Sequence, residues 1–278
     1  MNKTKMIAFS FDRPMQCDLM LKSFRNCVGD ITSIDIYVLY KASNDEFQEA
    51  YQICIKENKF AIFIEQDFFY ENIKELIEDS EHEYVLFCTD DTIFTRDFMI
   101  SEIEDILDEN NNLLNFSLRL GINTVYCYPL SVKQQVPEHN SIDRVFYWDW
   151  RIAEYDFGYP LELSSSILRM KDIKKFVNAW TFTDPNIMEW YMNASKNNFV
   201  DQYESACFYF SVAFSAPMNK VKEENKNRSS QKKEYSKNNL LKLYFDDYRI
   251  IPIKFYKYIS KGAHEEVEFE FERKIEKW

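Results

Sequence analysis

Residues 84–91 read YVLFCTDD, an apolar run that ends in two adjacent carboxylates, Asp90 and Asp91. The run has the length and the aromatic and β-branched content of a buried β-strand. A strand that ends there places two negative charges at the rim of a sheet, where they repel each other unless a cation offsets them. A divalent ion such as Mg2+ or Mn2+ would do so, especially one that also binds a phosphate. The alternative is an ordinary solvated turn after the strand.

Strands and amphipathic helices alternate around this run. Further strands are expected at residues 5–11, 35–40 and 60–64, with helices that begin near Pro14 and Asp45. Such alternation favours an α/β fold with a mostly parallel central sheet flanked by helices. In these sheets, ligands bind beyond the carboxyl ends of the strands.

Beyond residue 110 the pattern indicates a mixed sheet rather than a parallel one. A helix is expected to begin with Asp184 as N-cap and Pro185 at the first position, with Ile187, Trp190, Tyr191 and Ala194 facing inward. Residues 266–272 (EVEFEFE) alternate apolar and acidic side chains, which predicts an edge strand. Other strands are expected at residues 113–118, 124–128, 145–150 and 163–169.

The composition excludes several classes of protein. A net charge of −12 argues against a general affinity for nucleic acid. The four glycines lie far apart, so the glycine-rich loops of dinucleotide-binding folds and P-loop ATPases are absent, and any phosphate must be held by other groups. No apolar run reaches the roughly 20 residues of a membrane span, and the apolar stretch at residues 6–11 is too short for a signal peptide.

The six cysteines include no CxxC pair, and most of them stand in apolar segments. Reduced, packed thiols in a cytoplasmic protein are therefore expected, and a zinc site is not. Peripheral contact with a membrane is left open.

The first predicted strand leads into Asp12-Arg13-Pro14 at the same rim as the paired acids. The minimal interpretation is that Asp12 caps the helix in which Pro14 occupies the first turn. An N-terminal strand followed by D-R-P-x6-L-x-S, here Asp12 to Ser23, and then an apolar strand ending in T-D-D, resembles the GT-A glycosyltransferases of the family-2-like type. The resemblance spans about residues 5–220.

The resemblance implies a GT-A fold and a nucleotide-sugar donor, with a UDP-linked sugar as the first expectation. It assigns Ser10, Asp12 and Arg13 to the nucleoside pocket. It assigns the acid motif to the ribose and to the Mn2+ or Mg2+ ion that bridges the diphosphate, with Asp91 holding the ion and Asp90 assisting. Relatives often have glycines in the strand on the acceptor side that this chain lacks, so the acceptor contacts are not carried over.

Two more residues are candidates for the donor site. Arg119 lies in a strand-like apolar run and would contact the donor sugar or a phosphate, or else pair with a carboxylate such as Asp90. His264 follows Gly262 and Ala263. The resemblance implies that a late histidine completes the metal shell, whereas the alternative is a structural or solvated histidine.

Glu189 is the first candidate for the catalytic base. Inverting GT-A enzymes place a catalytic carboxylate on a helix roughly a hundred residues after the metal motif, and Glu189 follows Asp91 by 98 residues. The alternative is one more surface glutamate in an acidic chain. Asp149, between Trp148 and Trp150 in a segment whose rings suit sugars, and Glu162 are held in reserve.

The expected organisation is a GT-A catalytic domain over residues 1–218, divided into a nucleotide-binding half (1–110) and an acceptor-binding half (111–218). A flexible basic loop would follow at 219–239, as a plain linker or as a lid over the diphosphate, and a C-terminal extension at 240–278 would pack on the domain. The expected function is metal-dependent, inverting transfer of a sugar to a hydroxyl of a glycan, a lipid-linked sugar or a protein. A sugar nucleotidyltransferase and a non-catalytic carbohydrate-binding module are the alternatives.

Overall fold

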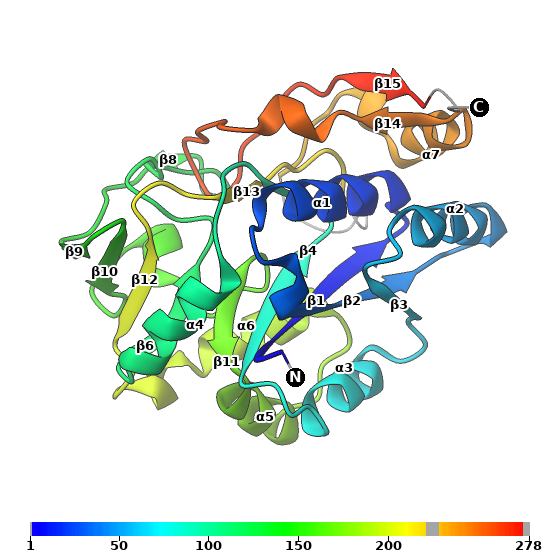
Figure 1. Ribbon diagram of the computed structural model, residues 1–278. Helices are drawn as coiled ribbons and strands as arrows, with labels where there is room; N and C mark the ends of the chain where they lie inside the picture. The colour runs from blue at the N-terminus through cyan, green and yellow to red at the C-terminus, as the bar shows by residue number, and fades with distance from the viewer. Residues whose placement is uncertain (1, 221–227, 275–278) are drawn as a thin grey trace.

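The computed structural model describes residues 2–220 and 228–274, and the described residues form a nine-stranded central sheet with the strand order β3-β2-β1-β4-β11-β6-β12-β10-β9 (Figure 1). Its first half is parallel throughout. The strands of that half are β1 (Thr4–Phe11), β2 (Ile34–Lys41), β3 (Ile62–Glu65) and β4 (Tyr84–Thr89).

The helices of the parallel half begin where the sequence predicts. Helix α1 (Pro14–Cys27) has its proline in the first turn, and helix α2 (Asp45–Glu57) is capped by the Asn44 side chain, which accepts a hydrogen bond from the Phe47 backbone NH. Helix α3 (Phe69–Glu78) follows β3. The predicted alternation of strands and helices is therefore confirmed over the first ninety residues.

The second half of the sheet is mixed, as expected. Strand β11 (Ser166–Arg169) lies antiparallel between β4 and β6 (Leu113–Ser117), so β6 runs in the same direction as β1 and β4. Strand β12 (Glu204–Phe208) is parallel to β6, and β10 (Val145–Asp149) and β9 (Asn140–Ile142) complete the sheet in antiparallel pairing. The carboxyl ends of β1, β2, β4 and β6 therefore share one edge.

Two hydrophobic layers enclose the sheet, because successive side chains of a strand point to opposite faces. Met6 and Ala8 of β1 pack with α1, α2 and α4 (Ile100–Glu109), whereas Ile7 and Phe9 pack with α3, α5 (Met170–Ala179) and α6 (Pro185–Ala194). Figure 1 shows α3 and α5 on the side of the sheet away from α1. Burial on both faces explains why the central strands are apolar runs rather than alternating ones.

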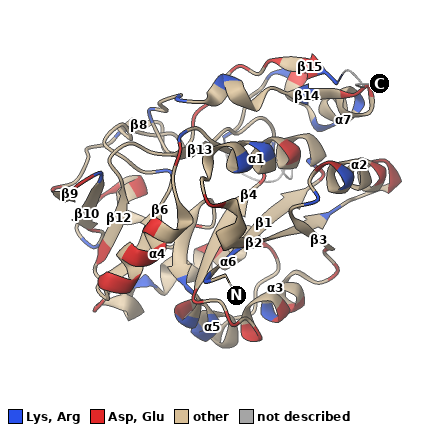
Figure 2. Ribbon diagram, in the orientation of Figure 1, with Lys and Arg blue, Asp and Glu red and all other residues tan. Residues whose placement is uncertain are grey.

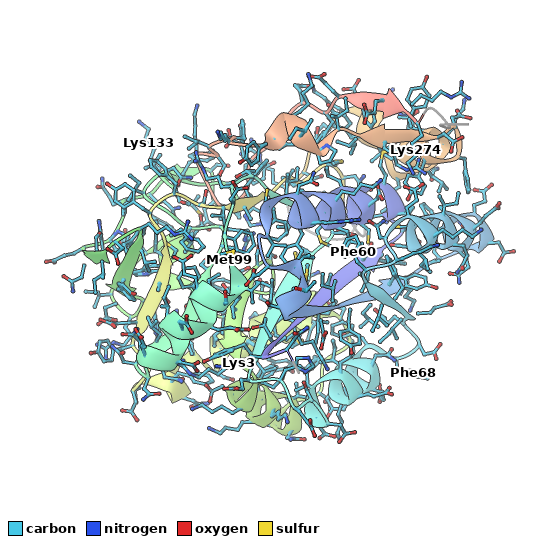
Figure 3. All side chains as sticks on the ribbon, viewed as in Figure 1. Lys3, Phe60, Phe68, Met99, Lys133 and Lys274 are labelled. Atoms are coloured by element: carbon cyan, nitrogen blue, oxygen red, sulfur yellow. The ribbon has the colours of Figure 1, made fainter. Side chains whose placement is uncertain are left out.

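A C-terminal layer packs on α1. It contains α7 (Lys237–Phe245), β14 (Tyr248–Ile250) and β15 (Phe271–Arg273), and Figure 1 shows it above α1. Arg249 joins the layer to the domain through an ion pair of 2.6 Å with Glu57 at the end of α2. Lys274, labelled at the outer edge in Figure 3, pairs with the same carboxylate at 2.7 Å.

One expectation about this region needs correction. Only residues 271 and 272 of the predicted edge strand 266–272 are in β15, because the preceding residues run beside the domain without a strand partner. The predicted basic loop 219–239 is only partly within the described residues, because residues 221–227 lie outside them. In its described part, Tyr235 is buried and α7 begins at Lys237.

The remaining expectations concern cysteines, membrane spans and charge. All six cysteines are buried and unpaired, as expected. Among the described residues, no helix is long and apolar enough to cross a membrane. The acidic excess is visible on the outer helices, most clearly on α4 (Figure 2). The short strands outside the central sheet are β5 (Thr92–Phe94), β7 (Tyr126–Cys127), β8 (Val132–Lys133) and β13 (Ala213–Ser215).

Candidate active site

A cavity of about 720 Å3 opens at the shared carboxyl edge of the parallel strands. Because β1, β4 and β6 end at this edge, residues more than a hundred positions apart in sequence line one space. Of the residues singled out from the sequence, those in its wall are Ser10, Arg13, Asp90, Asp91, Arg119, Glu162, Glu189 and His264.

Asp90 is the buried partner of Arg13. One carboxylate oxygen lies 3.0 Å from the Arg13 guanidinium, and the other accepts a hydrogen bond of 2.9 Å from Ser10. Burial raises the pKa of Asp90, and Arg13 opposes that rise. Arg13 also donates to both the side chain and the backbone carbonyl of Asn219. Asp90 is thus engaged within the protein and orients Arg13 at the cavity wall.

Asp91 occupies a different environment one residue later. Its carboxylate is partly exposed and accepts a hydrogen bond of 2.7 Å from the Thr89 hydroxyl. Its backbone carbonyl accepts a hydrogen bond of 2.8 Å from Ala216. The two acids therefore differ in availability, and Asp91 is the one that can offer an oxygen to a bound ion.

His264 reaches the site through an added layer of strands. Strand β5 follows Asp91 directly and pairs with β13, and Ser215 of β13 forms a backbone bridge with His264. Nε2 of His264 lies 3.2 Å from Nη1 of Arg119. A guanidinium only donates, so Nε2 accepts and the ring proton sits on Nδ1. Burial and the nearby Arg119 charge lower the pKa of His264 to about 3, which keeps the ring neutral.

The donor set around Asp91 and His264 fits a divalent cation that shares its coordination with a ligand. No group of three or more His, Cys, Asp or Glu in the described part of the chain could hold a metal ion by itself. One carboxylate and one neutral imidazole suffice for an ion that takes its other ligands from diphosphate oxygens and water. Nδ1 of His264 is buried and has no hydrogen-bond partner among the described residues. Binding through Nε2 requires Arg119 to turn toward another acceptor.

Arg119 forms its ion pair with Glu162 rather than with Asp90. Nη2 of Arg119 lies 2.6 Å from Glu162, and Nη1 donates to the Ser215 hydroxyl at 2.9 Å. Glu162 also accepts from the Ser166 hydroxyl and from the Ser164 backbone NH. The carboxylate of Glu162 is therefore fully hydrogen-bonded and paired, which makes it a poor base.

Glu189 stands on α6 and faces the cavity. Asp184 caps this helix, as predicted, because its side chain accepts hydrogen bonds from the backbone NH groups of Asn186 and Ile187. The predicted inward stripe of α6 is wrong: Met188 and Met192 are buried, whereas Trp190 is 61% exposed. The helix is rotated about its axis because both methionines enter the core between α3 and α5.

The surroundings of Glu189 favour its protonated form. One oxygen accepts a hydrogen bond of 2.9 Å from the Leu163 backbone NH, and the other faces the Tyr159 hydroxyl at 3.3 Å. Burial raises the pKa of Glu189 from 4.5 to about 7, and the Leu163 NH only partly opposes the rise. A carboxylate that titrates near neutrality at a cavity wall is suited to proton transfer.

Two predicted site residues lie outside the cavity wall. Asp12 accepts a hydrogen bond of 2.8 Å from the Ser43 backbone NH and has a left-handed φ of 55°, so it shapes the turn after β1. Asp149 forms an ion pair of 2.6 Å with Arg151. Strand β10 is antiparallel to β12, and Asp149 pairs there with Glu204, so it ends at the edge opposite the cavity.

Tyr159 and Asn219 are site residues that the sequence reading missed. Tyr159 meets Glu189, 30 positions away, and Asn219 meets Arg13 across 206 positions. Neither belongs to a local motif, and only the tertiary structure brings the partners together. Gly158-Tyr159-Pro160 was an available signal, because this segment lies in the loop between the predicted strands 145–150 and 163–169 and site residues are often on loops.

Comparisons with known proteins agree with this geometry. No protein-family model matches the sequence. The bifunctional glycosyltransferase pgtA of Dictyostelium discoideum is 28% identical over 193 residues, which cover 64% of this chain and 25% of pgtA. The chain thus spans about a quarter of the length of that relative.

A solved structure has the same architecture. The crystal structure of S. aureus TarS 1-349 in complex with UDP-GlcNAc matches with a TM-score of 0.52 and 14% identity, over 87% of this chain and 66% of that one. The same TarS fragment in complex with UDP has a TM-score of 0.49 and 14% identity, over 78% of this chain and 61% of that one. With parallel N-terminal strands leading into a mixed sheet, the chain has the GT-A glycosyltransferase fold that its sequence predicts.

Proposed function

We propose that the chain is a glycosyltransferase that transfers a sugar from a nucleoside-diphosphate sugar, UDP-linked, to an acceptor hydroxyl with inversion. One observation supports this above the others. The Asp91 carboxylate at the end of β4 and the titratable Glu189 carboxylate on α6 line the same cavity of about 720 Å3. An ion-binding acid and a general base facing one space are the two parts that inverting transfer requires.

The donor would lie over the ends of β1, β2 and β4. Ser10, Arg13 and Lys41 line this part of the cavity together with Asp91. Asp91 and His264 are the residues that would hold Mn2+ or Mg2+, and the bound ion would offset charge that develops on the leaving diphosphate. The TarS complex, which contains UDP-GlcNAc, supports the choice of UDP as the first nucleotide to test.

Glu189 would remove the proton from the attacking hydroxyl. A base is most effective when its pKa lies near the working pH, and burial brings Glu189 to about 7. Leu163 and Tyr159 hold the carboxylate in one orientation, so one oxygen can face the acceptor. Arg119, held by Glu162, would orient the donor sugar or a phosphate from the other side.

The test is acceptor-dependent release of nucleoside diphosphate. The protein is incubated with UDP-sugars, Mn2+ and a mixture of glycan acceptors, and nucleotide release and product linkage are measured. We expect UDP and a glycoside of inverted anomeric configuration. Formation of UTP and sugar 1-phosphate from the UDP-sugar when pyrophosphate is added would indicate a nucleotidyltransferase, and sugar binding without nucleotide or turnover would indicate a binding module.

Glu189→Gln tests the assignment of the base. This variant keeps the hydrogen-bond acceptor for Leu163 but cannot take a proton, so we expect transfer to fall by about 10²–10⁴-fold with donor binding retained. Asp143→Asn, an exposed residue in the turn before β10, is the matched control. If turnover of Glu189→Gln were close to that of the control, the base would have to be another residue.

A further inference from the structure

The two parts of the cavity differ in charge. The donor half, next to β1, β2 and β4, contains the cations Arg13 and Lys41 against Asp90 and Asp91, with Lys220 added at the wall. Arg228 stands over the Tyr128 ring, away from these strands, and pairs with Glu266. The acceptor half, around Glu189, contains Asp156, Glu162, Asp184 and Glu189 against the single guanidinium of Arg119.

Charged groups of the acceptor half lie close to one another. The Arg119 charge lowers the pKa of both Asp156 and Glu189, and the Glu162 charge raises the pKa of both. Nη2 of Arg119 forms an ion pair of 2.6 Å with Oε2 of Glu162, so the charge of Arg119 is largely neutralised by that pair. Asp184 adds a further carboxylate at the start of α6, five residues before Glu189, or about 7–8 Å along the helix axis.

Aromatic rings face the same space. Tyr155 is 41% exposed and Tyr159 is 38% exposed, and both line the cavity. Tyr155 has a left-handed φ of 52°, a conformation that costs energy for a residue with a side chain and that holds its ring at this wall. Rings with apolar faces suit a ligand that presents CH faces.

We infer that the acceptor is a carbohydrate without negative charge, and that the acceptor half discriminates against sugars with phosphate, sulfate or carboxylate groups. The inference rests on the proposed function. An anionic substituent there would meet Asp156 and Asp184, which form no ion pair in the described part of the chain, as well as Glu189 in its ionised form, and like-charge contact in a partly desolvated site is unfavourable. A neutral sugar, or one with an amino group, meets no such repulsion.

The test uses a glycan array with the UDP-sugar that binds best. We expect transfer to neutral or amino-bearing glycans, with a kcat/KM for each of them about tenfold or more above that for its matched uronate, phosphate or sulfate analogue. Transfer confined to anionic glycans would overturn the inference. So would absence of transfer to every glycan by a protein that still binds nucleotide sugar and releases UDP in its presence.

Asp184→Asn tests the charge directly, because asparagine retains the N-cap of α6 and removes one negative charge. We expect the ratio of kcat/KM between neutral and anionic acceptors to fall by about threefold, whereas Asp143→Asn leaves it unchanged. An unchanged ratio in both Asp184→Asn and Asp156→Asn would contradict the inference. A protein that binds no nucleotide sugar at all would instead contradict the proposed function.

Discussion

Glu189, the proposed base, lowers the stability of the fold around it when it ionises. The folded state holds the proton of this carboxyl more tightly than the unfolded chain does, since its pKa is raised from 4.5 to about 7. Stability is therefore full below about pH 4.5, falls as the pH rises toward 7, and stays lower above it. The proposed function of this residue is thus opposed to stability, as is common at active sites.

Glu189→Gln should consequently be more stable than the wild type at about pH 8, by an amount on the order of 2–3 kcal/mol, because glutamine cannot ionise. Chemical denaturation at two pH values measures this difference. At about pH 4 the two proteins should unfold alike. A variant that is equally or less stable than the wild type at the higher pH would show that Glu189 is not held in a desolvated site.

The same pKa predicts the pH dependence of turnover. Since the base must be ionised, kcat/KM should rise with pH through about 7 and then level off. Initial rates measured with saturating Mn2+ across the pH range give the profile. A flat profile between about pH 5 and 9 would exclude Glu189 as the base.

Asp90 and Asp91 should respond differently to the same substitution. Asp90→Asn leaves the Arg13 guanidinium buried without a counter-charge, so unfolding free energy should drop by about 3 kcal/mol. Asp91 is partly exposed and has no such partner, so Asp91→Asn should unfold within about 1 kcal/mol of the wild type. Urea titrations of the two variants decide the point, and equal losses would mean that the roles of the adjacent acids are not distinct.

At the scale of the elements, α6 links packing to chemistry. Met188 and Met192 fix its rotation in the core, and this rotation turns Glu189 toward the cavity. Its N-cap anchors the first turn, next to the Glu189 carboxylate. Asp184→Ala should therefore lower stability by about 1 kcal/mol and reduce turnover, whereas Asp184→Asn should retain the stability. Thermal melts compare the two, and equal stability of both variants would mean that the cap does not hold this helix.

Local patterns predicted the parallel half of the fold well. The strands and helices up to β4 are short, periodic and bounded by Pro14, Asn44 and the acid pair, so each one is specified by its own residues. The rotation of α6 and the shortening of the predicted edge strand 266–272 to its last two residues were not predictable in this way. Both depend on which surface each segment meets, and alternating acidic and apolar residues fit an extended segment as well as a strand.

The same contrast between local patterns and tertiary contacts holds for the site residues. Arg13 and Asp91 were found because strand ends meet at one edge of a parallel sheet. Asp149 was misplaced because β10 runs in the opposite direction, and nothing in its own sequence shows that direction. The pairing of Arg119 with Glu162 and of Tyr159 with Glu189 depends on the mixed half of the sheet, where the order of strands departs from the order of the chain.

At the scale of the whole molecule, the cavity depends on segments from both ends of the chain. The N-terminal strand brings Arg13, and the C-terminal layer brings His264 to the same wall through its bridge to Ser215. Arg249 and Lys274 fasten that layer to Glu57 on the domain. The layer is thus part of the site as well as of the core. Donor binding should therefore depend on the packing of the C-terminal layer against the rest of the domain.

Binding of nucleotide sugars to wild type and Asp91→Asn, with and without Mn2+, tests the central claim most directly. A ligand present at about 100 times its Kd adds about 2.7 kcal/mol of stability, which a thermal shift detects readily. We predict that at least one UDP-sugar stabilises the wild type in the presence of Mn2+, and that the metal-dependent part of this shift is lost in Asp91→Asn. The absence of a shift with every nucleotide sugar, or an equal metal-dependent shift in the variant, would contradict the account.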